Sequence, residues 1–193
     1  GGGGGGGGGE GGGGGGGGRG GGGGEGGGGG GGGGGTMYTH GTPFRRAVEE
    51  GLLDPKRVVQ IGIRGTQYDS EDLDFAKSVG IRVIKIEEFH ERGVIDVMSE
   101  AREIVGQSPT YLSYDIDFVD PTFAPGTGTP EVGGPNSYQA LQVVRELGGV
   151  NLIGADMVEV SPPFDPSGGT AFLGVSIMFE ILCQLSASRT RKK

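Results

Sequence analysis

Short apolar segments alternate with amphipathic ones from about residue 42 to the C-terminus. The apolar segments are rich in Val, Ile and aromatic residues and are bounded by Gly or Pro, which is typical of buried strands. We expect strands at Arg57–Ile63, Ile81–Ile86, Thr110–Asp117 and Leu152–Val160. Apolar spacing and capping residues predict helices after Thr42 and at Ser70–Val79, Val94–Val105, Ser137–Leu147 and Thr170–Leu185.

This alternation predicts the fold class. Strands that are apolar on both faces and separated by helices form βαβ units, whose right-handed crossovers give a parallel sheet. We therefore expect an α/β fold, with a parallel sheet as the middle of three layers and helices on both faces. In such folds ligands bind beyond the carboxyl ends of the strands.

Three carboxylates are expected at that edge of the sheet. Asp115 and Asp117 end the third strand, and Glu159 ends the fourth. Residues two apart in a strand point to the same face, so the two aspartates should repel each other unless a hard divalent cation lies between them. The alternative is that one aspartate caps the loop while the other is solvated, and that Glu159 pairs with a nearby Lys or Arg.

The chain divides into two compositional segments. Residues 1–35 are glycine except for Glu10, Arg19 and Glu25, and they form either a flexible tether or the product of a translated repeat or a damaged gene model. Such a segment buries no side chains and is predicted to be disordered. Residues 36–193 have ordinary composition and are long enough for one domain with its own core.

Charge and cysteine content narrow the function classes. The net charge is −8, from 24 acidic and 16 basic residues, so there is no electrostatic footprint for nucleic acid. A lone cysteine, Cys183, excludes an intrachain disulfide and indicates a reducing compartment, with core packing as its expected role. No run approaches ~18 uninterrupted apolar residues, so we expect no membrane span, and without a signal-peptide pattern we expect a cytoplasmic protein.

Three longer motifs resemble one enzyme family. The segment DIDFVDPTFAPGTGTPEVGG (residues 115–134) resembles the metal-binding segment of the ureohydrolases, the arginase and agmatinase family. THGTPFRRAVEEGLLD (residues 39–54) and GADMVEVSPPFDPSGGTA (residues 154–171) resemble two further motifs of its agmatinase and guanidino-acid hydrolase branch. The three occur in the family's order and cover its C-terminal half, from about Tyr38 onwards.

The resemblance implies a reaction and roles for five residues. It implies hydrolysis of a guanidino compound, agmatine or a guanidino acid, to urea and an amine, with two manganese ions that activate a water. Asp115 and Asp117 match metal ligands, and Glu159 matches the carboxylate that binds the substrate guanidinium. Thr129 matches a threonine of the same pocket and His40 a proton shuttle, whereas His90 matches no functional position. The family is also oligomeric, which implies a homo-oligomer.

One departure from the family pattern changes the expectation for activity. The family's other metal ligands are two histidines and two aspartates on GGDHS-type and DAHxD-type motifs. Neither motif occurs in this sequence, and polyglycine stands at the expected place. We therefore expect the chain as written to be inactive. The alternative function is a non-catalytic ureohydrolase-like fragment that only associates with intact paralogues.

Overall fold

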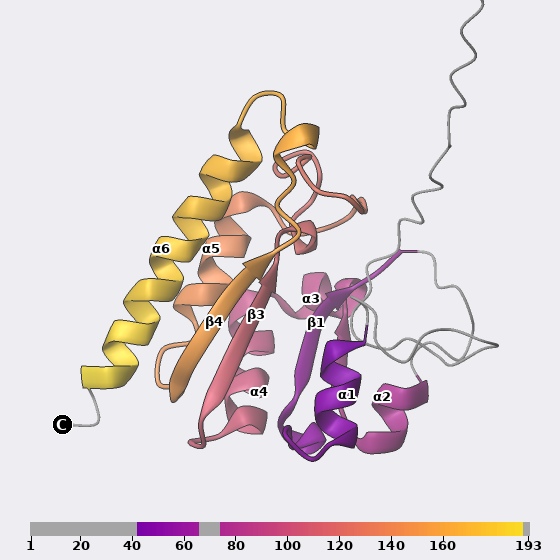
Figure 1. Cartoon of the computed structure of the whole chain (residues 1–193), viewed down its shortest axis with the longest axis vertical. Helices are drawn as coiled ribbons and strands as arrows, with labels where there is room; N and C mark the ends of the chain where they lie inside the picture. Colours follow the sequence, from indigo (N-terminus) through magenta and orange to yellow (C-terminus); the bar gives the residue numbers. More distant parts are fainter. Residues whose placement is uncertain (1–41, 66–73, 191–193) are drawn as a thin grey trace, which may run out of the picture.

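A computed structural model describes residues 42–65 and 74–190 of the chain. Four strands and six α-helices alternate along this part of the chain, with three short 3-10 turns between them (Figure 1). The strands are β1 (Val59–Ile63), β2 (Arg82–Lys85), β3 (Thr110–Asp115) and β4 (Leu152–Val158). The helices are α1 (Pro43–Glu49), α2 (Asp74–Val79), α3 (Ile86–Arg92), α4 (Val94–Val105), α5 (Ser137–Arg145) and α6 (Gly169–Thr190). The 3-10 turns are η1 (Pro55–Arg57), η2 (Ile116–Phe118) and η3 (Pro162–Phe164).

The parallel pairing that was predicted is confirmed, but the described strands form two pairs instead of one layer. β1 pairs in parallel with β2, and β3 pairs in parallel with β4. No hydrogen-bonded ladder joins the two pairs within the described residues. Figure 1 shows β1 and β3 side by side, each with an edge turned toward the other pair. The α/β class therefore holds, while the sheet is divided between its second and third strands.

Helices cover one face of the β3–β4 pair. α6 packs on β4 and on α5, and α5 in turn contacts α4 (Figure 1). On the opposite face Tyr111, Ser113 and Val158 are exposed, and no described helix lies over them. In the part of the chain that the structure describes, the second outer layer of the predicted three-layer arrangement is represented where α1 lies in front of β1 (Figure 1).

A continuous apolar core holds the two strand pairs in place. One cluster joins Tyr114 and Ile116 to α5 and α6, and a second joins Ile84 and Phe89 to α4. The Phe118 ring packs against both clusters and makes edge-to-face contacts with Phe89 at 5.6 Å and with Tyr114 at 5.9 Å. Because the loop after β3 carries Phe118, this core also anchors the segment that holds the candidate aspartates.

Helix α4 shows how closely local pattern can determine an element. Its bounds are those predicted, and the residues facing the core follow a spacing of three or four: Val94, Val97, Met98 and Ala101. Gly93 and Gly106 flank the helix with φ of 79° and 60°, which non-glycine residues rarely adopt.

Helix α6 differs from its prediction in two respects. It runs to Thr190, and Cys183 on it is exposed, so the core-packing role expected for this cysteine is wrong. The helix has 22 residues, and the mean hydropathy of its most apolar window is 1.6. By length and composition alone it could cross a membrane, and 22% of that window is buried inside the protein. A single such helix is weak evidence, and Ile177 and Ile181 of α6 are buried in the core.

Candidate active site

The loop after β3 brings Asp115 and Asp117 together by a different geometry from the one predicted. The strand ends at Asp115, and residues Ile116–Phe118 form a 3-10 turn. The expectation that both aspartates project from one strand is therefore wrong. Instead, the Asp115 carboxylate accepts a hydrogen bond from the Asp117 backbone N–H at 3.0 Å. This is the capping role weighed as the alternative, and it also places the two carboxylates near each other.

The electrostatics of Asp115 reflect this crowding. Burial, followed by repulsion from Asp117 and Glu159, raises the pKa of the Asp115 carboxyl to about 8, although the hydrogen bond from the Asp117 backbone acts in the opposite direction. Without a cation, Asp115 is therefore protonated at neutral pH. A divalent cation at this position would favour the ionised form and displace the proton.

Asp117 is held by two other parts of the chain. The Thr129 hydroxyl donates to Asp117 Oδ2 at 2.8 Å. Arg64, which follows β1, donates from Nη2 to the Asp117 carbonyl oxygen at 2.8 Å and to that of Glu131 at 2.7 Å. The Asp117 carboxylate is thus oriented by Thr129, and its backbone is fixed to the neighbouring strand pair by Arg64.

Glu159 lies at the end of β4 in an unusual backbone conformation. Its φ is +65°, the only positive φ of a non-glycine residue among the described residues. Such a conformation costs of order 1–3 kcal/mol and is found preferentially at functional sites. A Cβ on Gly128 would lie 3.8 Å from Glu159 Oε2, so the exposed glutamate faces the loop that carries Thr129. The Ser161 N–H donates to the Gly126 carbonyl at 2.8 Å and joins the two loops.

The structure therefore brings four of the five predicted site residues to one edge. Asp115, Asp117, Thr129 and Glu159 all lie at or beyond the carboxyl ends of β3 and β4. The fifth, His40, lies outside the described residues. Histidine 90 is exposed, and its Nε2 lies 2.8 Å from the Gly133 carbonyl oxygen, which accepts a hydrogen bond.

Arginine 64 was not predicted as a site residue. Its half-buried guanidinium lies among carboxylates: burial lowers its pKa, while Asp117, Asp120, Glu131 and Asp115 act in the opposite direction. One feature of the sequence could have identified Arg64 as a site residue. It directly follows a predicted buried strand, and a residue in this position is expected at the carboxyl edge of the sheet.

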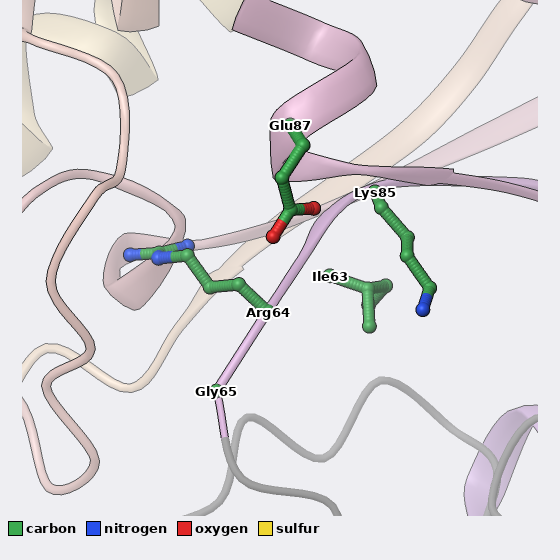
Figure 2. A pocket seen from close by; sticks show the side chains of 5 residues that line it. All are labelled: Ile63, Arg64, Gly65, Lys85 and Glu87. Atoms are coloured by element: carbon green, nitrogen blue, oxygen red, sulfur yellow. The ribbon is translucent and has the colours of Figure 1, made fainter.

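A pocket of about 190 Å³ lies beside Arg64, at the carboxyl ends of β1 and β2. Figure 2 shows its lining: Ile63, Arg64, Gly65, Lys85 and Glu87. The Arg64 side chain extends away from Lys85 in this view. None of the four predicted site residues that the structure describes lines this pocket, so it is adjacent to the candidate site and separate from it.

Tight packing requires glycine at two positions of the loop after β3, Gly126 and Gly134. A Cβ on Gly134 would lie 2.5 Å from the Asp120 N and 2.7 Å from Arg64 Nη2, and a Cβ on Gly126 would lie 2.4 Å from the Asp165 Cβ. Gly133 has a φ of +86°. Gly128, by contrast, has room for a side chain.

We expect Gly134→Ala to destabilise the chain by about 1–3 kcal/mol, because the backbone at Asp120 cannot move away without shifting the loop. Gly148→Ala is the matched control, since its nearest neighbour would be 3.6 Å from the new Cβ. Urea unfolding followed by circular dichroism measures both. Equal midpoints for the two variants would contradict this account of the loop.

The raised pKa of Asp115 also predicts a pH dependence for the metal-free chain. Its folded value of about 8 exceeds the ordinary value of 3.8, so unfolding between about pH 4 and pH 8 releases a proton. The contribution of Asp115 to the free energy of unfolding should therefore be greatest at about pH 4 and should fall by on the order of 6 kcal/mol by about pH 8. Urea midpoints in EDTA between pH 5 and 8 measure the slope. Asp115→Asn should remove the decrease of the urea midpoint with pH, whereas Asp74→Asn, at an exposed aspartate, should leave this decrease unchanged. If the decrease persists in Asp115→Asn, Asp115 is not its cause.

Metal-ligand geometry is incomplete in the described part of the chain. Residues 42–65 and 74–190 contain no group of three or more His, Cys, Asp or Glu side chains placed to hold a metal ion. Asp115 and Asp117 therefore offer a pair of carboxylates to a cation, with Glu159 further out.

The family model described as the Arginase family matches residues 33–183, more than half of the chain. The chain belongs to the arginase family. Guanidinopropionase from Pseudomonas aeruginosa is 62% identical over 154 residues, which are 80% of this chain and 48% of that protein. Guanidinobutyrase from the same organism is 52% identical over 76% of this chain and 46% of its own length.

Solved structures of the arginase family agree with this membership. Proclavaminate amidino hydrolase from Streptomyces clavuligerus superposes with a TM-score of 0.75 at 47% identity, covering 78% of this chain and 50% of that chain. The ureohydrolase fold expected from the sequence is therefore confirmed. The chain spans about half the length of the arginase-family relatives it matches.

Proposed function

We propose that this chain supplies the carboxylate side of the active site of a manganese-dependent hydrolase that cleaves a guanidino compound to urea and an amine. The observation that carries the proposal is the arrangement around Asp117. Thr129 fixes its carboxylate, Arg64 fixes its backbone, and Asp115 and Glu159 lie beside it at the same edge. The names of the relatives support hydrolysis of guanidino compounds.

The donor set suits part of a manganese site. Carboxylate oxygens are the ligands that hard divalent cations prefer, and Asp115 and Asp117 would hold such a cation between them. Thr129 occupies Oδ2 of Asp117 and leaves Oδ1 for a metal. The chemistry that a bound manganese pair supplies is activation of water as a nucleophile at neutral pH. Two aspartates cannot fix two ions, so the remaining ligands must come from another segment.

Glu159 would bind the guanidinium of the substrate. A carboxylate can accept two parallel hydrogen bonds from this planar, permanently charged group. The left-handed backbone at Glu159 turns the chain out of β4 directly beside Asp115 and the Thr129 loop, which would direct the substrate carbon toward the aspartates. His40 would serve as the proton shuttle, as its place in the family motif implies.

The substrate is agmatine or a guanidino acid. The relatives at 62% and 52% identity are named for guanidino acids, which favours a substrate with a carboxylate at its far end. The cytoplasmic location and the homo-oligomer expected from the sequence remain proposals. A non-catalytic role beside intact paralogues is the alternative, and the incomplete ligand set in residues 42–65 and 74–190 favours it for the isolated chain.

A chimaera tests the proposed function. The 154 residues of this chain that align with Pseudomonas guanidinopropionase replace the matching part of that enzyme. We expect manganese-dependent release of urea from 3-guanidinopropionate, 4-guanidinobutyrate or agmatine, each assayed separately. A folded chimaera that releases urea from none of the three would refute the proposal.

A further inference from the structure

The outer side of α6 is apolar, uncharged and exposed. Four large side chains recur at intervals of three, four and three residues, which places them on one side of the helix. These residues, the α6 flank, are Phe172, Val175, Phe179 and Leu182, and each is between 61% and 77% exposed. The residues that α6 buries in the core, among them Leu173, Ile177 and Ile181, lie on the opposite side.

A helix that is apolar on both sides is ordinarily covered on both sides. The charged residues of α6 are Glu180, which pairs with Arg145 of α5, and Arg189 in the last turn. The α6 flank itself contains neither, so it offers no ion pair to a charged partner. Isolated exposed apolar residues need no explanation, whereas four in one stripe mark a contact surface.

The position of α6 indicates what covers the flank. α6 packs on α5 and β4 and is the outermost helix on the β4 side of the molecule (Figure 1). Within the described residues, β4 pairs with β3 alone, so its other edge has unpaired backbone groups. A further strand beside β4, with its own helix beside α6, would satisfy the open edge and cover the flank together. The chain spans about half the length of its arginase-family relatives, so the relatives contain enough additional chain for such a unit.

We propose that the α6 flank and the open edge of β4 form the docking surface for the complementary half of an arginase-family domain, the part of the relatives that this chain does not match. The inference rests on the proposed function for its biological meaning, since the same docking would bring the remaining metal ligands to Asp115 and Asp117. A membrane is a poorer occupant, because Leu173, Ile177 and Ile181 would have to leave the core before α6 could cross a bilayer.

Cys183 provides a probe that needs no substitution. It is exposed, follows the flank residue Leu182, and lies one helical turn after Phe179. The test co-expresses the full chain with the tagged complementary half of Pseudomonas guanidinopropionase, in which every cysteine is replaced by serine. We expect the two to co-purify, and Cys183 to react with a thiol reagent at least ~10-fold more slowly in the complex than in the chain alone.

Substitutions give an independent measure of the same surface. Val175→Glu with Phe179→Glu should reduce co-purification at least ~10-fold, because two carboxylates would be buried without partners. Leu52→Glu with Ile95→Glu adds the same charge at two exposed apolar residues elsewhere and should leave co-purification unchanged. Circular dichroism checks that each variant is folded.

Several outcomes would overturn the inference: no co-purification, Cys183 labelling that is equally fast in the complex, or a flank variant that binds as well as its control. A chain that dimerises by light scattering, with the dimer abolished by the flank variant, would show that a second copy is the occupant. Protection of Cys183 by phosphatidylglycerol vesicles would identify a membrane surface instead. A complex that protects Cys183 but releases no urea with manganese would contradict the proposed function and support the docking surface. Urea release without protection of Cys183 would support the proposed function and contradict the docking surface.

Discussion

Glu159→Gln should cut urea release from the chimaera by about 10- to 150-fold while leaving its manganese content unchanged. The substitution keeps the shape of the side chain and removes the charge that would match the guanidinium. A charge-assisted hydrogen bond of this kind is worth roughly 1.5–3 kcal/mol, which corresponds to that range of rates. Glu159 lies beyond the end of β4 and matches the substrate carboxylate of the family rather than a metal ligand, so metal binding should not depend on it.

Two measurements on one preparation separate the roles. Metal analysis after gel filtration gives the manganese content, and initial rates of urea release give the activity. Glu131→Gln is the control for the loss of a carboxylate near the site. Arg64 donates a hydrogen bond to the Glu131 carbonyl oxygen, and this bond does not involve the side chain that is replaced. Loss of manganese in Glu159→Gln would show that this glutamate is a metal ligand and not the substrate carboxylate.

Asp117→Asn should abolish both manganese binding and urea release in the chimaera. Loss of a direct ligand is expected to exceed the ~100-fold effect that loss of an outer-shell partner can produce. An amide is a weaker ligand for a hard cation than a carboxylate, although it can still accept the hydrogen bond from Thr129. The same two measurements apply as for Glu159.

Asp120→Asn is the matched control for Asp117. Asp120 lies three residues further along the same loop and accepts hydrogen bonds from the Thr122 and Gly133 backbones. Its side chain caps the loop, so its substitution should lower stability slightly and leave manganese in place. If Asp117→Asn retains manganese as well as Asp120→Asn does, the assignment of Asp117 as a ligand is wrong.

The parts of the fold that were predictable depend on local pattern. α4 follows from its apolar spacing and flanking glycines. The strands β3 and β4 follow from their apolar runs, although each ends two residues earlier than predicted. Helix α3 was missed because it starts directly after β2 and is mostly charged, with only Ile86 and Phe89 buried. Its stability comes from contacts with β1 and α4, which no local pattern reveals.

The candidate site shows the same limit. The residue types were predictable, since acidic residues at strand ends and the motif around Asp115 carry the chemistry. The hydrogen bonds that Asp117 accepts from Thr129 and Arg64 come from residues 12 and 53 positions away, which no local pattern reveals. The division between β1 and β3 was equally unpredictable, because the choice of partner for each strand depends on contacts between segments far apart in the sequence.

Manganese content, counted per chain after gel filtration with urea release assayed on the same fraction, tests the central claim most directly. We expect the full 193-residue chain alone to hold no manganese pair and to release no urea, because Asp115 and Asp117 are its matched metal ligands. The chimaera should hold two manganese ions and turn over. Two manganese ions and turnover in the chain alone would contradict the account, as would a folded chimaera that binds none.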